Sequence, residues 1–171
     1  AQEFDFNTPI SHVKPILLAK PEQLLSKKES RIRLGIPNNA LAVYIQLGAG
    51  KINDIEGQLE MAIRILNENE SIHIVVGESI IGDRLRLEGA RIRIIRDYPN
   101  SLSFNGFDFA IMAGGYNSYH EAIAFQLPTI FVPNDGTGMD DQISRVNSGQ
   151  DAGACLVVNG RDQDEFRVAI E

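Results

Sequence analysis

The sequence predicts an α/β domain of the three-layer, Rossmann-like kind, with about six parallel strands and helices on both faces of the sheet. Two observations carry this prediction. Apolar runs of strand length recur along the chain, and segments with helical spacing separate them. The expected strands cover residues 41–47, 72–76, 90–95, 107–112, 129–132 and 154–158. Near-continuous apolar strands are typical of a sheet buried on both faces, whose ligand site lies beyond the carboxyl ends of the strands.

The composition fits one domain and disfavours several partners. The chain has 171 residues, 43% of them hydrophobic, and its 23 acidic and 16 basic side chains give a net charge of −7. Nucleic acid and anionic membranes are therefore poor candidates as partners. The apolar runs fall short of the roughly 18 residues that a membrane span needs, and no signal peptide is visible, so we expect a cytoplasmic protein. Because the first residue is not Met and the last residues resemble an opening helix, we expect a piece of a longer protein.

The first forty residues differ in composition from the remainder. They contain Pro9, Pro15, Pro21 and Pro37 between short apolar patches. Prolines at this density predict an irregular lead-in or interdomain segment over residues 1–40, with a short helix near residues 30–34 and no core element. The domain itself is expected over residues 41–171.

The first strand ends at Gly48-Ala49-Gly50 and leads into a helix expected over residues 54–67. This arrangement raises the dinucleotide-binding fingerprint. The third glycine position is Asn53, however, and no acidic residue ends the second strand at the usual distance of about 20 residues, since Glu78 lies about 30 residues on. A nicotinamide or flavin site is thus disfavoured. Two interpretations of Gly48 and Gly50 remain open, a plain turn and a loop that contacts a phosphate or an acceptor.

The most informative motif follows the strand expected over residues 107–112. Paired glycines, Gly114-Gly115, precede a helix that carries Glu121. Glycines let the backbone approach an anion, and the first N–H groups of a helix have no intrahelical partner, so the motif predicts an anion cradle. Ser118-x-x-Glu121 also fits a capping box, in which both side chains only satisfy backbone groups.

Three stretches of the chain resemble one family. Residues 113–123, residues 126–133 and Asp141-Gln142 are similar to the donor-binding, C-terminal half of glycosyltransferases with two Rossmann-like domains, the GT-B type. The resemblance is strongest to the UDP-glycosyltransferase group and to family 28, which contains the peptidoglycan enzyme that adds N-acetylglucosamine to lipid I. It covers roughly residues 28–160. Many relatives carry a phosphate-binding His where this chain has Ala113, which favours backbone donors for the diphosphate and places membership of the plant-like or macrolide-type branch in question.

The resemblance implies a role for each matching residue. The diphosphate would be held at the helix N-terminus, the ribose by a carboxylate, the transferred sugar by the Asp-Gln pair, and the base by the loop after the third strand. The residues for the diphosphate are Gly114, Gly115, Asn117 and Ser118, and the residue for the ribose is Glu121. The residues for the transferred sugar are Asp141 and Gln142, with Asp140 a less favoured substitute. The residues for the base are Arg96, Asp97 and Tyr98.

The resemblance further implies transfer of a sugar, such as a hexose, from a UDP-sugar to an unknown acceptor, without a metal or other cofactor. The general base is expected on an N-terminal acceptor domain that this chain lacks, so the chain alone should bind donor and transfer nothing. The three scattered histidines also disfavour a metal site. Two alternatives stay open: a nucleotide-sugar epimerase, and a non-catalytic donor-binding subunit that works with a separate acceptor-binding membrane partner.

Overall fold

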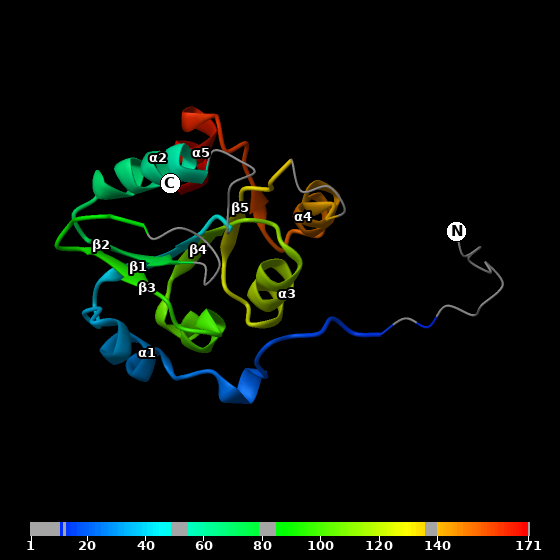
Figure 1. The fold of residues 1–171 in the computed structure, drawn as a ribbon, viewed down its shortest axis with the longest axis horizontal. Coiled ribbons are helices and arrows are strands. Elements are labelled where there is room, and N and C mark those ends of the chain that lie inside the picture. Colours follow the sequence, from blue (N-terminus) through cyan, green and yellow to red (C-terminus); the bar gives the residue numbers. More distant parts are fainter. Residues whose placement is uncertain (1–10, 12, 49–54, 79–84, 136–139, 171) are drawn as a thin grey trace.

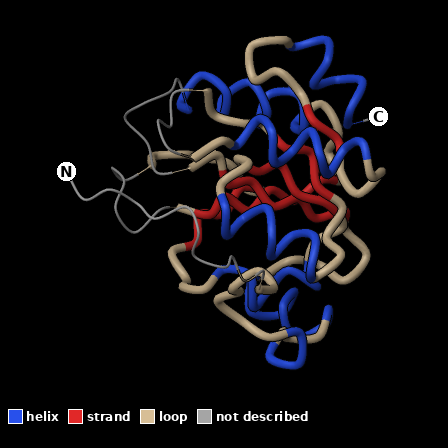
Figure 2. The backbone as a smooth tube through the Cα atoms, turned by 90° about the vertical axis from the view of Figure 1, so that its right-hand side faces the viewer, coloured by secondary structure: helices blue, strands red, loops and turns tan. Residues whose placement is uncertain are grey.

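The computed structural model describes residues 11, 13–48, 55–78, 85–135 and 140–170. These residues form a parallel sheet with the strand order β3-β2-β1-β4-β5-β6, seen edge-on between helices in Figure 2. Its strands are β1 (Leu41–Gln46), β2 (Ile72–Gly77), β3 (Ile92–Ile95), β4 (Phe109–Met112), β5 (Thr129–Phe131) and β6 (Leu156–Val157). The predicted fold class is confirmed, and each expected strand is present.

Helices cover both faces of this sheet (Figure 1). One face carries α2 (Ile55–Asn67) and α5 (Gln163–Ile170). The other carries α1 (Lys27–Leu34), the 3-10 helix η2 (Asn100–Gly106), α3 (Tyr116–Ala124) and α4 (Gln142–Asp151). A 3-10 turn, η1 (Pro21–Gln23), precedes α1. Among the described residues, no helix has the length and apolar character that a bilayer crossing requires.

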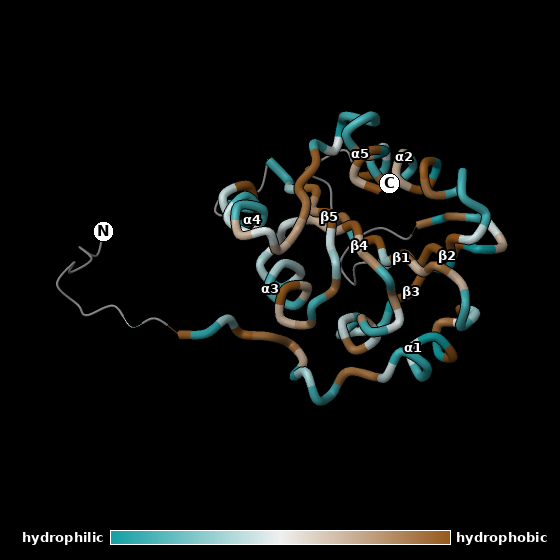
Figure 3. Tube along the Cα trace, turned by 180° about the vertical axis from the view of Figure 1, so that it is seen from behind, coloured by the Kyte–Doolittle hydropathy of each residue, from teal (hydrophilic) through white to brown (hydrophobic). Residues whose placement is uncertain are grey.

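The side chains of β1 alternate between two hydrophobic cores. Val43 and Ile45 pack in the core on the α2 side, whereas Ala42 and Tyr44 pack in the core on the α3 side. Figure 3 shows the strands as a band of hydrophobic residues between more polar helix surfaces. Removing such side chains from water is the main driving force that holds the three layers together.

Part of the lead-in belongs to the core. Helix α1 begins with a capping box between Ser26 and Glu29, and Leu34 and Ile36 are buried on the α3 side of the sheet. The expectation that residues 1–40 contain no core element is therefore wrong for this stretch, because local proline spacing does not report the apolar residues between the prolines. The domain boundary at residue 40 stays a prediction.

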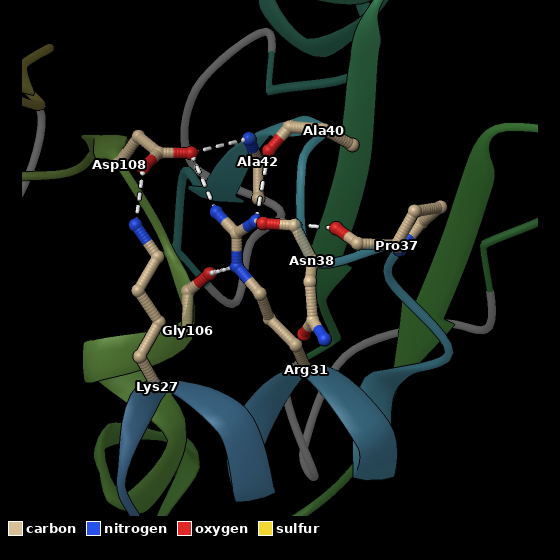
Figure 4. Close-up of polar contacts among 8 residues, drawn as sticks. All are labelled: Lys27, Arg31, Pro37, Asn38, Ala40, Ala42, Gly106 and Asp108. Atoms are coloured by element: carbon tan, nitrogen blue, oxygen red, sulfur yellow. Dashed lines mark hydrogen bonds and ion pairs between the residues drawn. The ribbon is translucent and has the colours of Figure 1, made fainter.

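A buried arginine fixes α1 to the amino ends of β1 and β4 (Figure 4). Arg31 is 2% exposed, and its guanidinium donates to Asp108 Oδ2 at 2.8 Å, to the Gly106 carbonyl at 3.1 Å, and to three carbonyls of the turn before β1. Asp108 also accepts from the Ala42 N–H and from Lys27 Nζ. Burial alone would raise the pKa of Asp108, but the hydrogen bonds from Lys27 and Ala42 and the nearby positive charges outweigh it and lower that pKa.

Candidate functional site

The strand order places a switch point between β1 and β4. From β1 the chain proceeds through β2 to β3 in one direction, and from β4 through β5 to β6 in the other. Ligands of open α/β sheets bind in the crevice at such a point, beyond the carboxyl ends of the strands. Gly48 follows β1 there with a φ of 106°, and a Cβ built on it would lie 4.0 Å from the Cβ of Ala113, which follows β4. Gly50, the other glycine of this loop, lies outside the described residues.

The helix after β4 begins without a side-chain cap. Gly115 is the N-cap residue of α3, and no side chain in the described part of the chain hydrogen-bonds the cap. The N–H groups of Tyr116, Asn117 and Ser118 in the first turn have no intrahelical partner, so the positive end of the helix dipole faces the switch point. Ser118 is the third helical residue, so the alternative of a Ser118–Glu121 capping box is wrong.

The paired glycines face different surroundings. A Cβ on Gly114 would lie 2.5 Å from Val146 Cγ1 of α4, so this position must lack a side chain for packing alone. Among the described residues, a Cβ on Gly115 would meet only Gln142 Nε2, at 3.9 Å, and the φ of −59° suits any residue. The described residues therefore leave space in front of Gly115, at the end of α3 where an anion is expected.

Asp141 and Gln142 already make contacts within the protein. Asp141 caps α4 by accepting from the Ser144 N–H at 3.0 Å, and the Ser144 hydrogen bonds lower the pKa of Asp141. Gln142 is 6% exposed, accepts from the Asn134 N–H at 3.1 Å and donates to Asp140 Oδ2 at 3.2 Å. These bonds fix the start of α4 against the loop after β5. The sugar-binding role of the pair stays a prediction.

A polar cavity of about 460 Å³ adjoins this segment, between α4 and the loop after β6. Several carboxamides line it: Asn134, Asn147, Gln150 and Asn159. Asn134 connects the cavity to the switch point, because its Nδ2 would lie 3.3 Å from a Cβ on Gly48. The size is that of a small-molecule pocket, and the lining suits a ligand rich in hydroxyl groups.

Glu121 is buried under the lead-in. Its side chain is only 5% exposed, and Oε1 accepts from the Leu18 N–H at 3.1 Å. The Ile16 N–H donates to the Tyr116 hydroxyl at 3.2 Å, so residues 16–18 lie along α3, as the blue segment in Figure 1 shows. Burial raises the pKa of Glu121, and the N–H groups of Leu18 and Ala19 offset part of that rise. Glu121 is thus a hydrogen-bond acceptor that the chain itself uses.

The loop predicted to bind the base is fixed at several points. Arg96 forms an ion pair with Glu78 at 2.8 Å, and Asp97 forms one with Arg33 at the same distance. Tyr98, by contrast, is 66% exposed. Glu78 directly follows β2, 30 residues after Gly48. Its carboxylate also accepts from the Leu85 N–H, so in this structure it is engaged by protein groups.

One residue near the glycine turn, Arg145, was not predicted from the sequence. Arg145 of α4 donates from Nη1 to the Gly114 carbonyl at 2.8 Å and from Nη2 to Asp140 Oδ1 at 2.6 Å. Its Cζ lies 5.8 Å from the centroid of the Tyr116 ring. The available signal was its spacing of three residues from Gln142, which places both on one helix face once the start of α4 is known.

Within the described ranges, histidine and carboxylate side chains do not gather into a metal site. Among the described residues, no group of three or more His, Cys, Asp and Glu is arranged to hold a metal ion. His120 lies between Tyr116 and Tyr119, with ring centroids 4.5 and 5.2 Å away. Burial, together with the charge of Arg145, lowers the pKa of His120.

Comparison with known proteins finds glycosyltransferases both among related sequences and among solved structures. No protein-family model matches the chain. An uncharacterised glycosyltransferase of Methanopyrus kandleri is 22% identical over 131 residues, covering 75% of this chain and 37% of the relative. Among solved structures, spinosyn rhamnosyltransferase SpnG complexed with thymidine diphosphate superposes with a TM-score of 0.65 at 22% identity, over 77% of this chain and 36% of that one. Glycosyltransferase VinC in complex with dTDP gives a TM-score of 0.59 at 16% identity, over 95% and 40%.

These likenesses establish the fold. The chain has the Rossmann-like α/β architecture of a domain of GT-B glycosyltransferases, and it spans well under half the length of the relatives that it matches. Identities of 16–22% establish the fold alone, so the substrate and the acceptor are argued from the geometry of the site.

Proposed function

We propose that this chain is the donor-binding domain of a glycosyltransferase that moves a sugar from a nucleotide diphosphate sugar, with uridine as the nucleoside, to an acceptor bound elsewhere in the whole protein. The observation that carries the proposal is the uncapped N-terminus of α3 behind Gly115, at the switch point of the sheet. The structures of SpnG and VinC, whose titles record thymidine diphosphate and dTDP, support a nucleoside diphosphate as the ligand class.

The diphosphate in this proposal accepts hydrogen bonds from the first-turn N–H groups of α3. A helix terminus favours an anion by about 0.3–1 kcal/mol at an exposed site, and more where it is partly buried. The same groups would stabilise the negative charge that develops on the departing diphosphate when an acceptor hydroxyl attacks the anomeric carbon. The base that deprotonates the acceptor is assigned to another part of the protein, so we expect donor binding without transfer from this chain.

The ribose is assigned to Glu121. The two ribose hydroxyls and the N–H groups of residues 18 and 19 are all hydrogen-bond donors. They therefore compete for the carboxylate oxygens of Glu121. Ribose binding therefore requires residues 16–19 to move from Glu121 or to share it. Replacing Glu121 with Gln tests this assignment without changing the size of the side chain.

The remaining parts of the donor follow from the positions of the other residues. The transferred sugar extends toward Asp141, Gln142 and the adjoining polar cavity. The base lies against the loop of Arg96, Asp97 and Tyr98, where the exposed Tyr98 ring offers a stacking surface.

Isothermal titration calorimetry with UDP, dTDP and GDP tests the proposal, and Gly115→Ala provides the matched variant. The added methyl group fits the unliganded fold but occupies the space in front of α3, so the variant should fold and bind UDP at least about tenfold more weakly. Absence of heat with all three nucleotides on the native chain would remove the hypothesis.

A further inference from the structure

Arg145 is placed beside the proposed diphosphate site by contacts from three directions. The Gly114 carbonyl and Asp140 hold two of its nitrogens, and the Tyr116 ring lies along the guanidinium. Gly114 and Tyr116 flank Gly115, the residue that opens the site. The side chain is 19% exposed, so it is largely fixed in place while one part reaches the surface.

The guanidinium retains donors for a ligand. Arginine has five N–H groups, and the two hydrogen bonds named above use one each. No described residue accepts a hydrogen bond from the other three. Since a guanidinium matches the oxygens of a phosphate in two-point contacts, these donors suit a diphosphate that rests on the end of α3.

Other described cations at the carboxyl edge lie farther from the glycine turn. Arg96 follows β3, which is separated from β4 by two strands, and it is paired with Glu78. Arg161 follows β6, beyond β5, is 78% exposed and lies 3.8 Å from Asp135. Neighbouring strands are about 4.8 Å apart, so neither position equals the direct contact of Arg145 with Gly114.

The chain carries a net charge of −7, and Asp140 and Asp141 lie at this same edge. A nucleoside diphosphate would approach a negative surface unless a local cation offset it. The position before the glycines is Ala113, which supplies no charge.

We propose that Arg145 is a diphosphate-binding residue, which supplies from α4 the positive charge that the glycine turn itself lacks. This inference rests on the proposed function. In it, Asp140 and the Gly114 carbonyl orient the guanidinium, and its remaining N–H groups bind phosphate oxygens of the donor. Arg145 thereby discriminates between a nucleoside diphosphate and the nucleoside alone.

The test compares UDP, UMP and uridine by calorimetry on the native chain, Arg145→Gln and Arg161→Gln. We expect Arg145→Gln to weaken UDP binding at least about tenfold and UMP binding less, while uridine binding is unchanged. Arg161→Gln removes a charge from the same edge and should change UDP binding less than about twofold. Arg145→Lys keeps the charge but loses the two-point contact, so it should give an intermediate loss.

Chemical protection supplies a measurement that does not depend on the variants folding. Phenylglyoxal modifies accessible arginines, and UDP should protect Arg145 of the native chain while uridine should not, as read by peptide mass spectrometry. UDP affinity unchanged in folded Arg145→Gln, an equal loss for uridine, or modification of Arg145 that UDP does not slow would each overturn the inference. If the native chain binds none of the nucleotides, the proposed function itself fails.

Discussion

Two arginine–aspartate pairs lie at opposite edges of the sheet. At the amino edge, Arg31 is 2% exposed and makes five hydrogen bonds, to Asp108 and to four backbone carbonyls. At the carboxyl edge, Arg145 is 19% exposed and makes two with the described residues. The chemistry of the pairs is the same, but their degree of saturation differs. A guanidinium with all its neighbours in place joins elements together, whereas one with donors remaining beside an open helix end is suited to a ligand.

The largest effect should come from breaking the saturated pair. Arg31→Met leaves Asp108 without its buried partner and several carbonyls without a donor, so we expect a loss of about 3–5 kcal/mol in the free energy of unfolding. Urea denaturation followed by circular dichroism measures it. Arg33→Met removes an exposed pair with Asp97 and should cost about 1 kcal/mol or less. Equal losses in the two variants would show that Arg31 is only a surface charge.

The paired glycines should separate packing from binding. Gly114→Ala forces a methyl group against Val146 and should cost about 1–3 kcal/mol of stability. Gly115→Ala should cost about 1 kcal/mol or less, since alanine is a poorer N-cap than glycine. Thermal denaturation of both variants checks the order. A larger loss for Gly115→Ala would mean that the space in front of α3 is filled in solution.

Glu121→Gln should weaken the binding of UDP by about 1.5–3 kcal/mol, because the ribose hydroxyls lose a charged acceptor. Calorimetry measures this change. Stability should respond much less, because the amide oxygen can still accept from the Leu18 N–H. If stability falls and UDP affinity does not, Glu121 only fastens the lead-in to α3.

Acid titration should show the smallest effect, with opposite signs for two carboxylates. The pKa of Asp108 is lowered in the fold, so its contribution to stability is present above its ordinary value of 3.8 and is lost as the pH falls below it. The pKa of Glu121 is raised from 4.5, so stability falls as the pH rises through the interval just above that value. Urea midpoints from pH 3 to 7 should therefore depend less steeply on pH at the acidic end in Asp108→Asn. In Glu121→Gln, the decline just above pH 4.5 should be absent. A native pH profile in either variant would contradict the assigned cause.

The sheet was predictable from the sequence because each strand is a short apolar run, and burial on both faces leaves a strong local signal. Helix α1 was less visible, since the core contribution of this segment rests on Leu34 at its last turn and on Ile36 just after it, in a stretch that also contains Gly35 and Pro37. The glycine turn could be located because its residues are adjacent in the sequence. The contacts of Arg145 with Gly114 and of Leu18 with Glu121 could not, because they join segments 31 and 103 residues apart. Which carboxylates accept hydrogen bonds from other residues of the chain is decided only by tertiary packing.

The most direct test of the central claim is a nuclear magnetic resonance titration of the labelled chain with UDP. If the end of α3 binds the diphosphate, the backbone amide signals of Gly115, Tyr116, Asn117 and Ser118 should shift saturably, and those of Ala42 and Asp108 at the opposite edge should stay in place. Saturable binding that leaves the four α3 amides unmoved would contradict the account.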